Sequence, residues 1–134
     1  MSTADELSRK ALANFKCGYN CAQSVLLALL EQIEPEGKCD LVPKIATGFG
    51  SGFGGCGSVC GALVGAVMAV GVKYGSNDSD PKRRTKVYEA TRTLYREFEK
   101  QHGSAMCSTL KANKKLCTEL VEWVIHSYVA MEKP

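Results

Sequence analysis

The sequence has no Cys-x-x-Cys pair, one tryptophan and two histidines, and no apolar run of the ~20 residues that a membrane-spanning helix needs. The missing Cys-x-x-Cys excludes standard zinc ribbons, thioredoxin-type motifs and bacterial ferredoxin spacing. No Cys-x-x-Cys-His is present, so we expect no haem. The polar N-terminus lacks the apolar core of a signal peptide, so we expect a cytoplasmic protein without membrane insertion.

Charge and length limit the kinds of partner and the number of domains that we expect. A net charge of +3 over 134 residues is too small to indicate binding to nucleic acid, so we expect no nucleic-acid partner. A chain of this length can bury its own core, which predicts one domain over residues 1–134. Apolar residues recur at helical spacing and no strand pattern is convincing, so we expect an all-α fold of about five or six helices.

Several predicted helices have recognisable ends. Asn20 is a good N-cap for a helix over 21–33. Asp80-Pro81 is a strong start for a long helix to about residue 101, with Gly103 closing it. Further helical segments are expected over 3–16, 40–47, 106–110 and 115–131.

The chain is organised around residues 48–72. Residues 48–57 hold six glycines in ten positions, and residues 59–72 are apolar and predict a buried, glycine-rich central helix. The first part contains Gly-x-Gly-x-x-Gly, but no convincing strand precedes it, which disfavours a dinucleotide site. We expect its backbone amides to surround cysteine sulfur or an anion instead. One face of the helix is bare, so a second helix or a cofactor can approach closely at Gly61, Gly65 and Ala69.

The seven cysteines are the unusual feature. A cytosolic cysteine cluster is more often catalytic, redox-active or metal-binding than a static disulfide framework. Cys17 with Cys21, and Cys56 with Cys60, form two Cys-Gly-x-x-Cys pairs, each next to a predicted helix start. This spacing predicts both sulfurs on one side of a helical turn, where the helix N-terminus favours thiolate. The alternative is that the cysteines are small buried hydrophobes.

Other polar and sulfur-bearing residues give weaker signals. The basic run 82–84 falls in the first turn of a helix, where positive charge is unfavourable. It hints at an anionic partner, although a solvated surface offset by Asp78 and Asp80 is the favoured interpretation. His102 is a candidate ligand or proton donor, or simply ends a helix. Cys39 stands alone in a polar loop and is expected to be incidental.

Several short motifs together resemble a known family, the small redox-active proteins named for a C-GCAxxG-C-C pattern. The motifs are Asn20-Cys-Ala-Gln23, Cys60-Gly-Ala-Leu-Val-Gly65 with Ala66, Met68 and Gly71, and then Cys107 and Cys117. The resemblance implies that the characteristic cysteines are Cys21, Cys60, Cys107 and Cys117. A related module occurs in split-Soret cytochromes, which carry an iron–sulfur cluster beside their haems, so only the cluster or thiol chemistry carries over.

Our first hypothesis is therefore a redox protein whose catalytic or metal-binding centre is formed by these four cysteines. The thiolates either hold an iron–sulfur cluster or cycle between dithiol and disulfide, with Cys21 or Cys60 as the attacking thiolate. An unspecified redox partner protein is implied. Lysines near two of the cysteines would favour thiolate; they are Lys111, Lys114 and Lys115. The neighbouring residues expected to contact a cofactor are Cys17, Cys56, Gly55, Gly57 and Gly61.

Two alternatives belong to other classes. In one, zinc closes a four-cysteine site in a structural or trafficking module. In the other, the buried helix and the last helix form the surface of a homodimer, without redox activity.

Overall fold

The computed structural model describes residues 3–33, 41–110 and 113–132, and this part of the chain is all-helical, as predicted. The long helices are α1 (Thr3–Lys16), α2 (Cys21–Ile33), α5 (Gly61–Tyr74), α6 (Pro81–His102) and α8 (Lys114–Glu132). The short ones are α3 (Leu41–Ala46), the 3-10 helix η1 (Thr47–Phe49), α4 (Gly50–Phe53) and α7 (Cys107–Leu110). None of these described helices combines the length and the hydropathy needed to cross a bilayer.

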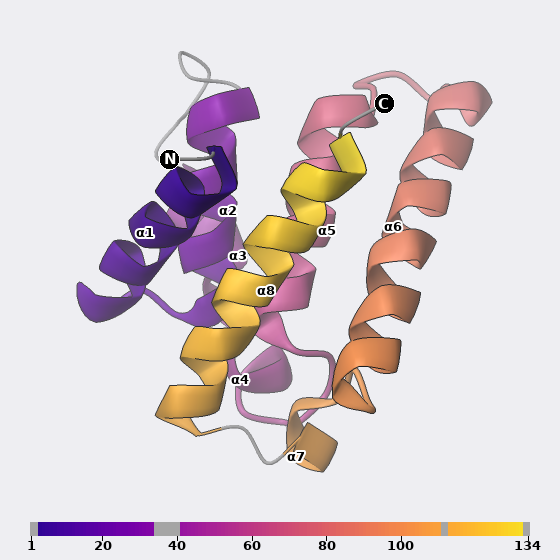
Figure 1. The fold of residues 1–134 in the computed structure, drawn as a ribbon. Helices are drawn as coiled ribbons and strands as arrows, with labels where there is room; N and C mark the ends of the chain where they lie inside the picture. Colours follow the sequence, from indigo (N-terminus) through magenta and orange to yellow (C-terminus); the bar gives the residue numbers. More distant parts are fainter. Residues whose placement is uncertain (1–2, 34–40, 111–112, 133–134) are drawn as a thin grey trace.

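The long helices run in two opposite directions. Figure 1 shows α2, α5 and α8 running one way, while α1 and α6 run the other way. The starts of α2, α5 and α8 therefore lie at the same end of the bundle, together with α4 and α7. Elements far apart in the sequence thus place their first turns close to one another.

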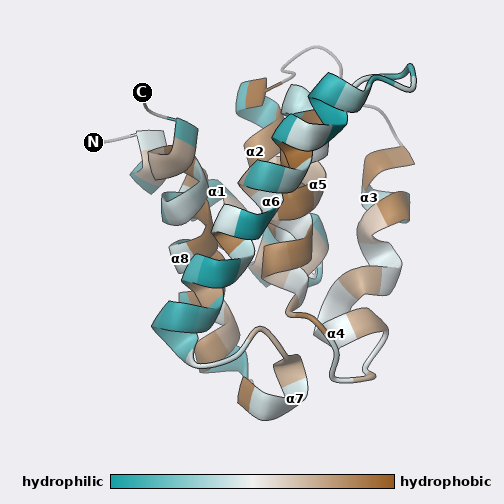
Figure 2. Ribbon diagram, turned by 90° about the vertical axis from the view of Figure 1, so that its right-hand side faces the viewer, coloured by the Kyte–Doolittle hydropathy of each residue, from teal (hydrophilic) through white to brown (hydrophobic). Residues whose placement is uncertain are grey.

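The core lies between α5 and the helices packed against it, which are α2, α6 and α8. Helix α1 covers α2 and α8 from the other side. Figure 2 shows α5 as mostly hydrophobic behind the largely hydrophilic outer face of α6. The fully buried side chains include Leu29, Leu63, Phe98 and Ile125. Burial of each such side chain contributes about 1.5–3 kcal/mol.

Helix α5 lies unusually close to α2 because of its small residues. A Cβ atom at Gly65 would lie 2.6 Å from the carbonyl oxygen of Ala22, and one at Gly61 would lie 3.4 Å from the amide nitrogen of Ala22. Of the two uses expected for this bare face, close packing of a second helix is therefore the one found. The contact fixes the start of α5 against the start of α2.

The predicted caps of α2 and α6 are confirmed. The Asn20 carboxamide oxygen accepts a 2.9 Å hydrogen bond from the backbone N–H of Gln23. Asp80 accepts from the backbone N–H of Lys82, and Gly103 ends α6 with a left-handed φ of 90°. The expected start of the short helix at residue 40 lies outside the described residues, as does Cys39.

The glycine-rich stretch over residues 48–57 is only partly helical. Its first six residues form the end of η1 and the single turn of α4, and residues 54–56 continue as turns and a bend. Two residues with side chains, Ser51 and Phe53, adopt left-handed backbone angles there, with φ of 53° and 67°. Alternating glycines supply the remaining left-handed positions, so the chain can turn several times within a few residues.

Replacement of Gly65 by alanine tests the close contact between α5 and α2. Gly65→Ala should lower the free energy of unfolding by about 1–3 kcal/mol, because its Cβ would overlap the Ala22 backbone. Gly71→Ala is the matched control in the same helix, since a Cβ there would meet nothing within 4 Å. The control should be neutral or stabilising by up to ~1 kcal/mol. Urea denaturation measures both, and equal stability of the two variants would contradict the packing described here.

Candidate functional site

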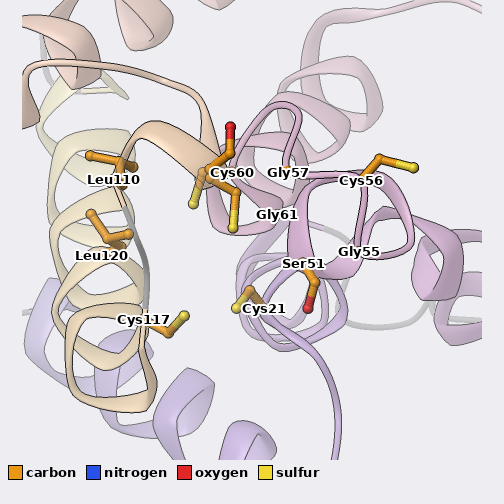
Figure 3. Close-up of a pocket in the computed structure, with 12 residues that line it drawn as sticks. Cys21, Ser51, Gly55, Cys56, Gly57, Cys60, Gly61, Leu110, Cys117 and Leu120 are labelled. Atoms are coloured by element: carbon orange, nitrogen blue, oxygen red, sulfur yellow. The ribbon is translucent and has the colours of Figure 1, made fainter.

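Four cysteines line one cavity at the end of the bundle where α2, α5 and α8 begin. They are Cys21, Cys60, Cys107 and Cys117, and the cavity has a volume of about 420 Å³. The rest of its wall is formed by Ser51, Gly55, Cys56, Gly57, Gly61, Ser108, Leu110 and Leu120. Figure 3 shows Cys21 and Cys117 facing each other from two helices, with Cys60 on a third. The fold thus brings together sulfurs that are far apart along the chain.

Each of the four cysteines lies at the start of a helix. Cys21 is the first residue of α2, Cys60 is the N-cap of α5, Cys107 is the first residue of α7, and Cys117 lies in the first turn of α8. The first N–H groups of a helix have no intrahelical acceptor and carry partial positive charge. This position favours the anionic form of sulfur in α2, α5 and α8.

Cys21 is held by a network of side chains around the start of α2. The backbone N–H of Asn20 donates 3.0 Å to the side-chain oxygen of Gln23, which completes a reciprocal cap. The Gln23 amide also donates 2.8 Å to the Pro43 carbonyl, and the Asn20 amide donates 2.8 Å to the Thr47 carbonyl. The sequence analysis predicted Asn20 as the cap but gave Gln23 no capping role, although the Asn-x-x-Gln spacing is a capping-box signal.

Cys107 is brought beside Cys60 by a short pairing of two segments. The Cys60 N–H donates 2.8 Å to the Ala105 carbonyl, and the Cys107 N–H donates 2.7 Å to the Ser58 carbonyl. Val59 and Met106 form an isolated antiparallel bridge between these bonds. Two segments with no strand pattern thus pair over a few residues, which the sequence analysis did not foresee.

The thiols of Cys21 and Cys117 are linked by a side-chain hydrogen bond. The Cys21 thiol donates, which raises the pKa of Cys21, and burial raises it further. The same bond lowers the pKa of Cys117 to about 7, against the effect of its partial burial. The interaction therefore favours the anionic form of Cys117 over that of Cys21.

The other two cavity cysteines, Cys60 and Cys107, have raised pKa values. Burial raises the pKa of Cys60, which is 5% exposed, although the backbone N–H groups of Ala62 and Leu63 oppose this. Burial also raises the pKa of Cys107, and the nearby Cys117 adds to the effect. Of the four cavity cysteines, Cys117 is therefore the one whose pKa is lowered, whereas Cys21 and Cys60 were the expected attacking thiolates.

The glycine-rich wall approaches the cysteines closely, and backbone hydrogen bonds within this segment use some of its amides. A Cβ at Gly52 would lie 2.6 Å from the Ser58 nitrogen and 2.9 Å from the Cys107 Cβ. The backbone N–H of Ser58 donates to the carbonyl of this glycine, and that of Cys56 donates to the Phe53 carbonyl. The amides of Ser58 and Cys56 are therefore not available to bond sulfur or an anion.

The expected cofactor-contacting glycines all line the cavity, at positions 55, 57 and 61. A Cβ at Gly57 would lie 2.7 Å from the Ser108 Cβ, so only glycine fits beside this part of the wall. A Cβ at Gly61 would lie 3.4 Å from the Cys21 Cβ and 3.0 Å from the Phe49 carbonyl oxygen. The lack of side chains here leaves room between the four sulfurs.

The Cys-Gly-x-x-Cys pairs do not place both sulfurs together. Cys17 is exposed and is not among the cavity-lining residues, because residues 17–20 form the turn between α1 and α2 and not a continuous helical turn. Cys56 lines the cavity, but Figure 3 shows its sulfur pointing away from the other cysteines. His102 packs against Phe98 and Trp123, with ring centroids 4.6 and 4.9 Å away, and does not line the cavity.

The arrangement of the four cysteines bears on whether they would bind a single metal ion or a group of several metal ions. Structural zinc needs four ligands within about 2.0–2.3 Å of one point. Within the described part of the chain, no three Cys, His, Asp or Glu side chains are arranged to hold one metal ion. Four cysteines spaced around a cavity of about 420 Å³ fit better a polynuclear group, in which each metal takes one or two thiolates.

Comparison with known proteins gives a family match over most of the chain. The family model described as "Putative redox-active protein (C_GCAxxG_C_C)" matches residues 19–131, a span that includes all four cavity cysteines. Comparison with curated proteins and with solved structures gives no match.

Replacement of Cys21 tests the hydrogen bond that makes Cys117 acidic. In reduced, metal-free protein, alkylation of Cys117 should rise with pH around a midpoint of about 7. Cys21→Ala removes the donor, which stabilises the thiolate, so the midpoint should move upward toward the ordinary thiol value. Mass spectrometry of the Cys117 peptide across pH measures the shift. Cys17→Ala is the control, and an unchanged midpoint in Cys21→Ala would contradict the proposed bond.

Replacement of Gly52 tests the close approach of the glycine-rich wall. Both Gly52 and Gly18 have left-handed backbone angles, with φ of 69° and 106°, but a Cβ at Gly18 would meet nothing within 4 Å. Gly18→Ala should therefore destabilise by about 1–2 kcal/mol through strain alone. Gly52→Ala should destabilise more and change the alkylation rate of Cys107. Equal effects on unfolding, with unaltered Cys107 reactivity, would contradict this account.

Proposed function

The chain belongs to the C_GCAxxG_C_C family of redox-active proteins, and we propose that it transfers electrons by means of an iron–sulfur cluster held by Cys21, Cys60, Cys107 and Cys117. The observation that supports the proposal most is that these four thiols, from four separate segments, line one cavity. A dithiol centre would use only two of them, whereas Cys₄ ligation is the usual arrangement for both common cluster types.

The protein's own residues would set the conditions for such a group. When bound, the cluster supplies one-electron chemistry that side chains alone do not offer. The four thiolates gather negative charge, and the first turns of α2, α5 and α8 offset it. Burial of Cys60, together with Leu110 and Leu120 in the wall, limits access of water. Gly55, Gly57 and Gly61 keep the space between the sulfurs open.

Zinc is less well supported. A single ion would require the four sulfurs to converge on one point, and the described residues contain no such group of three or more ligands. A cluster distributes its bonds over several irons, so its cysteines can stand farther apart around a cavity.

A dithiol–disulfide centre is the second candidate, and the hydrogen bond between Cys21 and Cys117 favours it. The Cys117 thiolate would attack a substrate disulfide, forming a mixed disulfide and releasing one substrate thiolate. Cys21 would then lose its proton and attack the Cys117 sulfur, releasing the second substrate thiolate. The protein is oxidised by two electrons to a Cys21–Cys117 disulfide, and the substrate disulfide is reduced to two thiols.

Protein purified without oxygen distinguishes the two candidates. We expect broad visible absorption, with iron and acid-labile sulfide in equal amounts. Cys→Ser substitution at any of the four cavity cysteines should lower iron content several-fold, because each removes one ligand. Cys17→Ser is the matched control and should keep the iron, because Cys17 is exposed and outside the cavity.

The dithiol centre would be supported instead if the protein stays colourless after reconstitution with iron and sulfide. Such a protein should show a two-electron thiol titration that is lost in Cys117→Ser. Retention of iron in all four cavity variants would remove both assignments.

A further inference from the structure

A second recess lies at the end of the bundle opposite the cysteine cavity. It is formed where α5 ends and α6 begins, and Figure 1 shows this corner far from α4 and α7. Its volume is about 400 Å³, and it is lined by Lys73, Tyr74, Lys82, Arg83 and Lys86. Four of its five lining residues are cationic, and none is acidic.

The nearby acidic residues face a different recess. Asp78 and Asp80 line a neighbouring hollow together with Arg84. Asp80 also uses one carboxylate oxygen to accept hydrogen bonds from the backbone N–H groups at the start of α6. Of the basic run 82–84, Arg84 therefore lines the hollow that holds these two acids, whereas Lys82 and Arg83 line the recess.

Two of the cations in the recess have a structural task. The Lys73 ammonium pairs with Glu132. The Arg83 guanidinium donates 3.2 Å to the Gly75 carbonyl, which satisfies the C-terminal end of α5. These contacts account for Lys73 and Arg83 without any ligand.

The other two cations have no such explanation. Within residues 3–33, 41–110 and 113–132, neither Lys82 nor Lys86 forms an ion pair. The Lys86 ammonium lies 4.7 Å from the centre of the Tyr74 ring, which holds it over the recess. Lys82 is the second residue of α6, where a positive charge is unfavourable because it opposes the helix dipole.

We propose that this recess binds a phosphate-bearing small molecule. A phosphate group would pair with Lys82 and Lys86, whose ammonium groups supply charge-assisted hydrogen bonds. The volume lies in the range of small-ligand sites, about 300–1,000 Å³. Because Tyr74 is the only aromatic residue of the lining, recognition centres on the anionic group. The site is separate from the cysteine cavity and does not depend on the redox proposal.

Isothermal titration calorimetry at constant ionic strength tests the site, with pyrophosphate, ADP and sulfate as the probes. Pyrophosphate and ADP should bind the wild-type chain, and sulfate should bind at least tenfold more weakly. The double variant Lys82→Gln/Lys86→Gln should weaken pyrophosphate binding at least tenfold. Arg96→Gln/Lys100→Gln is the matched control, with the same spacing and charge loss on exposed residues farther along α6.

The probes also separate two sources of the phosphate. Equal affinity for pyrophosphate and ADP would assign an inorganic anion, and tighter binding of ADP would assign a nucleotide whose base contacts Tyr74. Either result supports the proposal. Sulfate binding as tight as pyrophosphate binding, equal weakening in both double variants, or no binding at millimolar pyrophosphate would overturn it. Circular dichroism establishes that both variants are folded.

Discussion

The shared direction of α2, α5 and α8 is the constraint on which the site depends. Each helix leaves its first N–H groups without an intrahelical acceptor, and three such ends meet in one place. Positive helix ends that converge repel one another unless negative charge lies between them. Cysteine sulfur in these first turns supplies that charge when it is deprotonated, so the arrangement of helices and the placement of the cysteines can stabilise each other.

The close contact between α2 and α5 makes this geometry possible. At Gly65 the two backbones approach so closely that a methyl group would overlap the Ala22 carbonyl. Since this contact lies near the starts of both helices, it determines how far Cys21 stands from Cys60. The reciprocal cap of Asn20 and Gln23 then orients Cys21 and links it to the end of α3. The spacing between two sulfurs thus depends on residues that have no redox chemistry.

Much of the fold could be predicted from the sequence. The all-α class, the bounds of α1 and α2, and the caps at Asn20, Asp80 and Gly103 follow from periodicity and local hydrogen bonding, which depend on neighbouring residues. The set of four cysteines came from the resemblance, and not from spacing. Their grouping could not be derived locally, because the pairing of Val59 with Met106 depends on two segments that meet only after folding. The acidity of Cys117 likewise depends on a distant donor. The Cys-Gly-x-x-Cys motifs misled for the same reason, since the turn after α1 directs Cys17 to solvent.

The unequal burial of the four sulfurs gives the cavity an inner and an outer side. Cys60 lies against the core, whereas Cys107 and Cys117 are only partly covered by the short α7 and the first turn of α8. In the electron transfer that we propose, an oxidant or a docking protein would meet these two sulfurs first, so the side beside α7 would be its point of approach.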